Sequence, residues 1–267
     1  MKKPRRRRIE VAPIAGLLVG MGCVLAGQLL DGGTVRSILH LAAAVIVFGG
    51  TLGAALVSFP RAQVMQAASA LRALVLEAGD DTDAAADGLV RCAWIARTHG
   101  ILALEDHAER HPDPLVQKAL RLVVDGTSSR HVREIVEIDI ANQEDRDHVP
   151  ARVFEALGGY APTFGILGAV LGLIHVMENL GDPARLGSGI ATAFVATVYG
   201  VGAANLAFLP IAARLRERAE RRALRGEMIL EGVLAIQEGL APRLVEEKLQ
   251  TYRQPAGSRP RRVVRAA

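Results

Sequence analysis

The chain has 267 residues, of which 50% are hydrophobic, 22% are charged and 4% are aromatic, and its formal net charge is +4. The apolar residues form clusters and the charged residues fall between them. This composition excludes an ordinary soluble enzyme and predicts a membrane protein with several spans and a polar domain. The two cysteines lie far apart in the sequence and predict neither a disulfide nor a metal site.

The first two apolar segments predict a membrane hairpin at residues 11–59, after a basic N-terminus at residues 1–10. We expect one span at about Val11–Leu30 and a second at about Ser37–Phe59, because each segment is long enough to cross a bilayer. Glycines in both spans predict close packing of helices. The first span is expected to be an uncleaved signal anchor, since no cleavage site follows it.

A polar, helix-forming segment follows at residues 60–152. Hydrophobic periodicity and turn residues predict four helices within it. These helices are expected at Arg61–Ala78, Leu89–Ala108, Leu115–Val124 and His131–Asp147.

The most informative segment is a second predicted membrane hairpin at residues 153–211. Its two spans contain no Asp, Glu, Lys or Arg, although a proton or cation pathway at membrane depth needs a titratable or anionic group. If ions pass, another chain must supply the acid. The candidate groups of this chain are uncharged and include Thr163, Thr192, Thr197, Tyr199 and Asn205. For each threonine, a hydroxyl bonded to a carbonyl of its own helix is the alternative interpretation.

Each span of the second hairpin also contains a proline, Pro162 in the first and Pro210 in the second. Proline removes an amide donor, frees a carbonyl and bends a helix. Paired bends in neighbouring helices predict a hinge. A passive kink is the alternative interpretation of either proline alone.

Charged helices are predicted at residues 212–252, and a basic tail at residues 253–267 is predicted to be disordered. Basic residues gather on one side of the four spans, so the positive-inside rule predicts that both termini and residues 60–152 are cytoplasmic. Because topology already explains the basic flanks, we expect membrane lipid around the spans and no nucleic-acid partner. The predicted fold class is an all-α membrane protein with four transmembrane helices, a helical cytoplasmic domain and a cytoplasmic C-terminal helix.

No enzyme signature is present in the sequence. His107 and His111 are four residues apart, but the acidic residue lies one place too late for a metalloprotease motif, and Pro112 ends the helix. There is no phosphate-binding loop and no nucleophile motif. We therefore predict no catalytic residue, no metal and no cofactor.

Residues 158–212 read GGYAPTFGILGAVLGLIHVMENLGDPARLGSGIATAFVATVYGVGAANLAFLPIA. This segment resembles the third and fourth spans of flagellar stator A subunits, which belong to the MotA/TolQ/ExbB ion-channel family. The resemblance implies a ring of A subunits, pentameric in the family, around the membrane helices of two B-type subunits that supply the missing aspartate. It also implies a place in the bacterial inner membrane and coupling of ion flow to torque on a rotor switch protein.

The resemblance assigns roles to individual residues. Stator A subunits carry an Arg and a Glu eight residues apart that face the rotor, and Arg97 and Glu105 fit this spacing. Without the resemblance, both would read as ordinary surface charges. The two functional prolines of the family correspond to Pro162 and Pro210.

Two positions bear on the coupling ion. Sodium-type relatives have a threonine in the third span where this chain has Ala169, whereas the fourth-span threonine is kept as Thr197. Sodium must exchange its hydration oxygens for protein oxygens, and an alanine side chain offers none. We therefore expect protons rather than sodium ions to drive this chain.

Two alternatives remain open at this point. A TolQ/ExbB-type subunit would use the proton-motive force to drive a periplasmic transducer, but such relatives have three spans and this chain is predicted to have four. A membrane scaffold without ion flux is the other alternative, and a neighbouring gene for a single-span partner with a membrane aspartate would argue against it.

Overall fold

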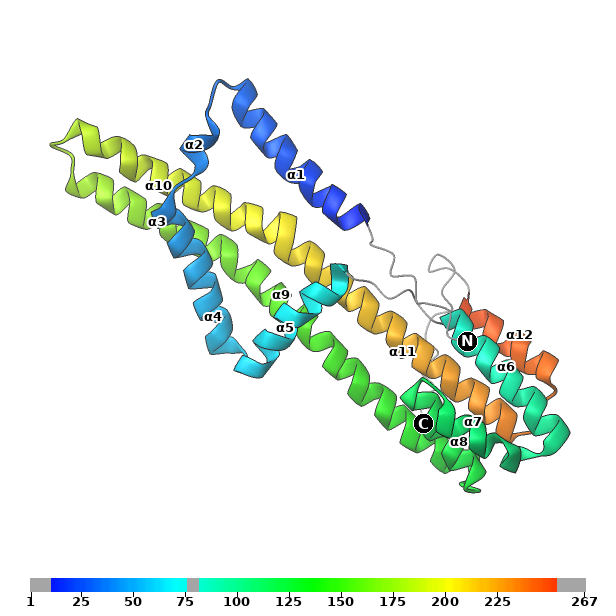
Figure 1. The fold of residues 1–267 in the computed structure, drawn as a ribbon. Helices are drawn as coiled ribbons and strands as arrows, with labels where there is room; N and C mark the ends of the chain where they lie inside the picture. Colours follow the sequence, from blue (N-terminus) through cyan, green and yellow to red (C-terminus); the bar gives the residue numbers. More distant parts are fainter. Residues whose placement is uncertain (1–10, 76–81, 254–267) are drawn as a thin grey trace. The chain divides into compact units, whose positions relative to one another are not determined.

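The computed structural model describes residues 11–75 and 82–253, and every regular element in these ranges is a helix (Figure 1). The chain forms two compact units. Unit 1 comprises Met1–Gly79 and Asp147–Arg218, and unit 2 comprises Asp80–Arg146 and Ala219–Ala267. The predicted N-terminus at residues 1–10 lies outside the described residues, as does the predicted tail beyond its first residue.

Unit 1 begins with α1, Val11–Leu30, which has the predicted bounds of the first span. The prediction of one helix at Ser37–Phe59 is wrong at its start. Leu39 and His40 have extended backbones, so a short helix ends before them and a longer helical run begins after them. These pieces are α2 (Val35–Ile38), α3 (Leu41–Ala44), the π-helix η1 (Val45–Gly49) and α4 (Gly50–Ser58).

Pro60 separates α4 from α5, Arg61–Val75, because proline lacks the amide donor that would continue the helix. The last three residues of the helix predicted to end at Ala78 lie outside the described residues. The inner side of α5 packs in a small core with α4, α9 and α11. The buried members of this core are Ala55, Ala67, Ala151, Val153, Phe154, Leu157, Ala212 and Leu215.

The longest helix is α9, which runs over 50 residues from Ser129 to Glu178. It joins the predicted helix at His131–Asp147 to the predicted third span, so the expected boundary at residue 152 is not a break in the helix. Two prolines, Pro150 and Pro162, lie inside it. Each removes a single amide donor, and the turns on either side keep their hydrogen bonds.

The fourth predicted span is continuous with the charged helix that follows it, as the sequence predicts. The elements in order are α10 (Pro183–Gly202), the π-helix η3 (Ala203–Phe208) and α11 (Leu209–Gln237). A turn with Gly239 at φ +73° ends α11, because glycine adopts this left-handed conformation at little cost. The last helix, α12, then runs from Pro242 to Arg253.

Besides α12 and parts of α9 and α11, unit 2 contains the four helices that lie between α5 and α9 in the sequence. They are α6 (Thr82–His99), the 3₁₀-helix η2 (Ile101–Leu104), α7 (Glu105–Arg110) and α8 (Pro114–Val124). The prediction of one helix over Leu89–Ala108 is wrong, because Gly100 has φ +86° and reverses the chain between α6 and η2. The prediction of a helix at Leu115–Val124 is confirmed to within one residue.

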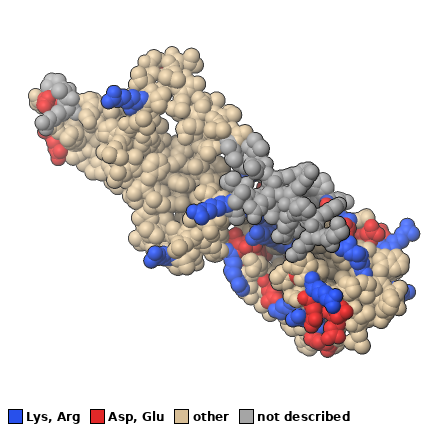
Figure 2. All heavy atoms as spheres, in the orientation of Figure 1, with Lys and Arg blue, Asp and Glu red and all other residues tan. Residues whose placement is uncertain are grey.

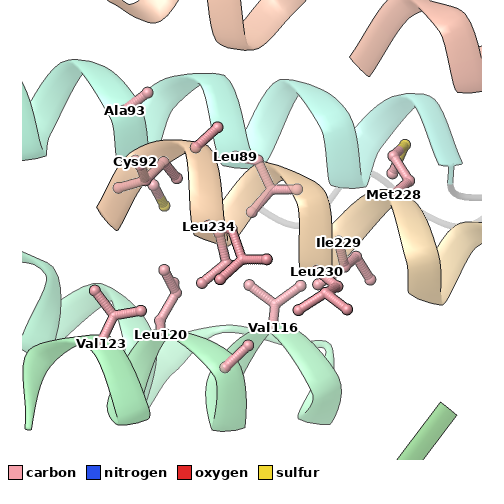
Figure 3. Packing of buried hydrophobic residues seen from close by; sticks show 14 of the residues in the cluster. Leu89, Cys92, Ala93, Val116, Leu120, Val123, Met228, Ile229, Leu230 and Leu234 are labelled. Carbon is pink, nitrogen blue, oxygen red and sulfur yellow. The ribbon is translucent and has the colours of Figure 1, made fainter. Parts of the chain in front are cut away.

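The core of unit 2 lies between α6, α8 and α11 (Figure 3). Figure 3 shows side chains from these three helices pointing toward one another. Its labelled residues are Leu89, Cys92 and Ala93 of α6, Val116, Leu120 and Val123 of α8, and Met228, Ile229, Leu230 and Leu234 of α11.

Within residues 11–75 and 82–253, three helical stretches are long and apolar enough to cross a membrane. They are Leu41–Ser58, a part of Ser129–Glu178 and a part of Leu186–Gln237, and Ala15–Leu30 is a shorter apolar helix. On the face shown in Figure 2, charged side chains gather on one part of the surface, whereas uncharged residues cover most of the part that contains the apolar helices.

Candidate functional site

The second hairpin is built on direct contact between the backbones of α9 and α10. A Cβ atom added at Gly172 would lie 2.7 Å from Ala193 N and 2.7 Å from Gly189 O. A Cβ atom added at Gly200 would lie 2.5 Å from Ala161 O. Small residues let membrane helices approach this closely. The glycines therefore fix how the two candidate ion-pathway helices face each other.

A second face of α10 packs against the helical run that follows the break at Leu39–His40. Its buried contacts join Ala43 and Val47 to Val195 and Ala196. The ring of Tyr199 lies beside Phe48, with centroids 5.8 Å apart. The first and second hairpins are thus held together through α10.

The Tyr199 hydroxyl braces the broken helix of the first hairpin. It donates to the Ile38 carbonyl at 2.6 Å and accepts from the His40 amide at 3.3 Å. The two extended residues between α2 and α3 leave backbone groups without helical partners, and such groups are costly in a membrane. Tyr199, predicted as an ion-pathway residue, therefore satisfies one backbone donor and one backbone acceptor of a neighbouring helix.

Thr192 adds a second polar contact at the same place. Its hydroxyl donates to the Ser188 carbonyl at 2.9 Å, so it is free to accept from Nε2 of His40, which lies 3.3 Å away. Helix α10 therefore makes two hydrogen bonds to His40. Tyr199 accepts from the His40 backbone amide, and Thr192 accepts from the His40 ring.

The other polar candidates are bonded to their own helices. Thr197 Oγ1 donates to Ala193 O at 3.2 Å, and Thr163 Oγ1 donates to Tyr160 O at 2.6 Å. Asn205 Nδ2 likewise donates to the carbonyl four residues earlier, at 3.0 Å. The alternative interpretation of the threonines, a hydroxyl satisfied within its own helix, is confirmed. These groups keep lone pairs that can face a ligand.

A third face of α10 has no covering helix within the described chain. It is an open stripe of residues at intervals of three and four, and Phe194 in it is 71% exposed. Its members are Ile190, Phe194, Thr197 and Val201 of α10 and Asn205 of the following η3. Ala169 lies at the level of Thr197, because a Cβ atom at the neighbouring Gly168 would lie 2.6 Å from Ala196 Cβ. The two positions that bear on the coupling ion therefore share one level of the hairpin.

The two predicted hinge prolines lie in regions that contact each other. A Cβ atom at Gly158, one turn before Pro162, would lie 2.6 Å from Leu209 Cδ2, and Leu209 directly precedes Pro210. The π-helix η3 ends at Phe208, two residues before the second proline. π-Helical turns of this kind often mark functional sites. Beyond the prolines, Arg216 forms an ion pair with Glu155, which joins α11 to α9.

The two spans of the second hairpin contain no carboxylate of this chain. Residues 156–177 of α9 and 186–213 of α10–α11 contain no Asp, Glu, Lys or Arg. No cluster of metal-binding side chains occurs in residues 11–75 and 82–253. The two spans thus offer small residues, hydroxyls and two prolines, and no charged side chain.

The predicted rotor-facing residues lie in unit 2, on two different helices. Arg97 is exposed in the last turn of α6, and its Nη1 donates to Gly239 O at 3.2 Å. Glu105 is exposed at the start of α7. The reversal at Gly100 and the 3₁₀ turn η2 separate them, so their eight-residue spacing does not describe two turns of one helix.

A network of charges joins the helices of unit 2 around Glu231. Its carboxylate lies 2.5 Å from Lys248 Nζ and 2.9 Å from Arg133 Nη1. Burial alone would raise the pKa of Glu231, but hydrogen bonds and attraction from the two cations outweigh burial and lower this pKa. In the adjacent core, burial raises the pKa of the Cys92 thiol, so this cysteine is a packing residue rather than a reactive one.

Comparison with known proteins agrees with this architecture. The family model described as MotA/TolQ/ExbB proton channel family matches residues 107–228, and the model described as Motility protein A N-terminal matches residues 14–98. YtxD of Bacillus subtilis (strain 168) is 33% identical over 248 residues, which are 92% of this chain and 91% of that protein. Motility protein A of the same organism is 32% identical over 245 residues, which are 91% of each chain.

A solved structure gives the same result in three dimensions. A chain in the structure of the flagellar MotAB stator complex from Bacillus subtilis is 31% identical to this chain and superimposes with a TM-score of 0.83. The match covers 92% of this chain and 96% of that chain. The sequence relatives and the shared fold together show that this chain belongs to the MotA/TolQ/ExbB proton channel family.

Proposed function

We propose that this chain is the ion-conducting A subunit of a bacterial flagellar stator. The observation that carries the proposal is the open, uncharged stripe of α10, which holds Thr197 but no acid, in a chain that matches Motility protein A over most of its length. The name of that relative and the stator complex from Bacillus subtilis support a role in motility.

The proposed topology has four spans in the inner membrane, with both termini and the segment between spans two and three in the cytoplasm. Three apolar helical stretches and the 20-residue helix α1 support the count. The basic residues before α1 and after Ile211 support the orientation.

The proposed partner in the membrane is a B-type subunit whose span carries an aspartate. The open stripe of α10 suits such a helix, because it is apolar apart from Thr197 and Asn205. Several copies of this chain, five by resemblance to the family, would surround that helix. An acid is needed because the two spans of the hairpin have no carboxylate of their own.

We propose protons as the coupling ion. At the level of Thr197 the facing helix carries Ala169, which has no side-chain oxygen. The Thr197 hydroxyl proton is already bonded to Ala193 O, so Thr197 and Ala169 together offer one side-chain oxygen at this level. A sodium ion takes several oxygen ligands, whereas a proton needs one carboxylate and a water path.

In this proposal Pro162 and Pro210 form the hinge between the ion site and the cytoplasmic helices, and Arg97 and Glu105 contact a rotor switch protein. Packing of Gly158 against Leu209 supports a hinge that links the two spans. The exposure of Arg97 and Glu105 supports their access to a partner.

The test is rotation in a bacterial strain without stators that expresses this chain with its B-type partner. We expect rotation that persists without external sodium and stops with a protonophore. Rotation that needs sodium and survives the protonophore would refute proton coupling. A complex that never rotates the motor but energises a periplasmic transducer would refute the stator assignment.

A further inference from the structure

An ion pair joins the α7–α8 hairpin of unit 2 to α11, in addition to the hydrophobic core that they share. Arg225 of α11 lies with its Nη2 atom 2.6 Å from Oδ2 of Asp113. The two side chains are 26% and 12% exposed, compared with 40% and 22% for Lys248 and Glu231. Water therefore screens the attraction between Arg225 and Asp113 less than the attraction between Lys248 and Glu231.

Asp113 uses both of its oxygens. While Oδ2 pairs with Arg225, Oδ1 accepts the amide of Leu115 at 2.9 Å and caps the N-terminus of α8. The carboxylate therefore joins the beginning of α8 to the side of α11. A change at this one residue affects both the cap and the ion pair.

Contacts with α8 determine the position of helix α7. Gln117 of α8 donates from Nε2 to the Glu109 carbonyl at 3.0 Å, and Leu104 and Ala108 are fully buried in the core of the unit. Since α7 has only six residues, these contacts determine where it lies. Glu105, its first residue, is thus placed by α8 and indirectly by Arg225.

Arg97, the other predicted rotor-facing residue, is also bonded to the end of α11. Its guanidinium donates to Gly239 O in the turn that ends α11. Helix α11 begins at Leu209, directly after η3 of the fourth span. The two charges that lie on different helices therefore share one supporting helix.

We propose that Arg225 is a positioning residue for the rotor-facing surface: through Asp113 it fixes α7, and with it Glu105, on α11. This role rests on the proposed stator function. Arg225 lies outside the proposed ion site and the proposed rotor contact, and its effect passes through Asp113.

The experiment compares Arg225→Met, Arg225→Lys and Asp113→Asn in the full chain with its B-type partner. Asp113→Asn keeps an oxygen that can cap α8 but loses the charge, and Arg225→Lys restores a single cationic donor. Lys248→Met is the matched control, because it removes an ion pair between α12 and α11 in the same unit without touching α7. Three quantities are measured: stall torque, proton conduction by the complex, and amide hydrogen exchange of each helix.

We expect Arg225→Met and Asp113→Asn to speed exchange in α7 at least about tenfold, as loss of a charge-assisted hydrogen bond implies. Stall torque should fall several-fold while proton conduction stays normal. Arg225→Lys should recover part of both losses, and Lys248→Met should change neither. Unchanged exchange in α7 would overturn the positioning role, whether or not the chain rotates a motor. An equal fall in torque and conduction would also overturn it. If the wild-type complex fails to rotate or conduct, the stator function fails instead.

Discussion

Replacing Tyr199 with Phe tests whether the hydroxyl braces the broken helix of the first hairpin. The change removes the donor to Ile38 O at 2.6 Å and the acceptor for the His40 amide at 3.3 Å. It keeps the ring and its contact with Phe48. Each unsatisfied, partly buried group costs roughly 1–3 kcal/mol, and the longer bond contributes less, so we expect a loss of about 2 kcal/mol in the free energy of unfolding.

Thermal unfolding of the purified protein in detergent measures this loss. For a chain of this size, about 2 kcal/mol corresponds to a fall of roughly 4–8 °C in Tm. Tyr160→Phe is the matched control. The Tyr160 hydroxyl lies 2.8 Å from Ser58 Oγ. Because the Ser58 hydroxyl already donates to Ala54 O, it keeps that hydrogen bond when the Tyr160 hydroxyl is removed, so Tyr160→Phe should cost less than about 0.5 kcal/mol. Equal stability of Tyr199→Phe and the wild type, or an equal loss in both variants, would refute the bracing role.

Three further predictions concern packing, charge and torque. Gly172→Ala should destabilise the hairpin by about 1–3 kcal/mol, because the new Cβ atom would lie 2.7 Å from Ala193 N, whereas Gly159→Ala has open space and should be neutral or stabilising in the same unfolding assay. Because its pKa is lowered in the folded protein, Glu231 contributes stability above the pKa of the unfolded chain and loses it as the pH falls through the lower folded value. Glu231→Gln should therefore cost about 1 kcal/mol at pH 7, after allowance for solvent screening, and progressively less as the pH falls from the ordinary glutamate pKa of about 4.3 through the lower folded pKa, as followed by denaturant unfolding. Arg97→Glu should lower stall torque while leaving membrane insertion and proton conduction intact, and normal swimming under load would contradict the assigned rotor contact.

Much of the fold could be predicted from apolar length and from turn residues. The bounds of α1, the end of α4 before Pro60 and the extension of the fourth span into α11 follow from these patterns. The break at Leu39–His40 could not be predicted in this way, because an apolar run carries no local signal for two extended residues. Their cost is offset by Tyr199, which is distant in sequence. Gly100 did offer a signal, but helical periodicity on both sides outweighed it.

The candidate site was harder to predict because neighbouring positions of one helix point in different directions. Thr197 and Tyr199 are both polar residues of the fourth span, and the sequence suggests one role for both. Residues that are two apart in sequence differ by about 200° around the axis of an α-helix, so Thr197 and Tyr199 cannot share a face. In the structure Tyr199 faces the first hairpin and Thr197 lies on the open stripe. A partner helix that packs on that stripe would contact Thr197 and not Tyr199. Substitutions at Thr197 should therefore change ion coupling with little loss of stability, and Tyr199→Phe should do the reverse.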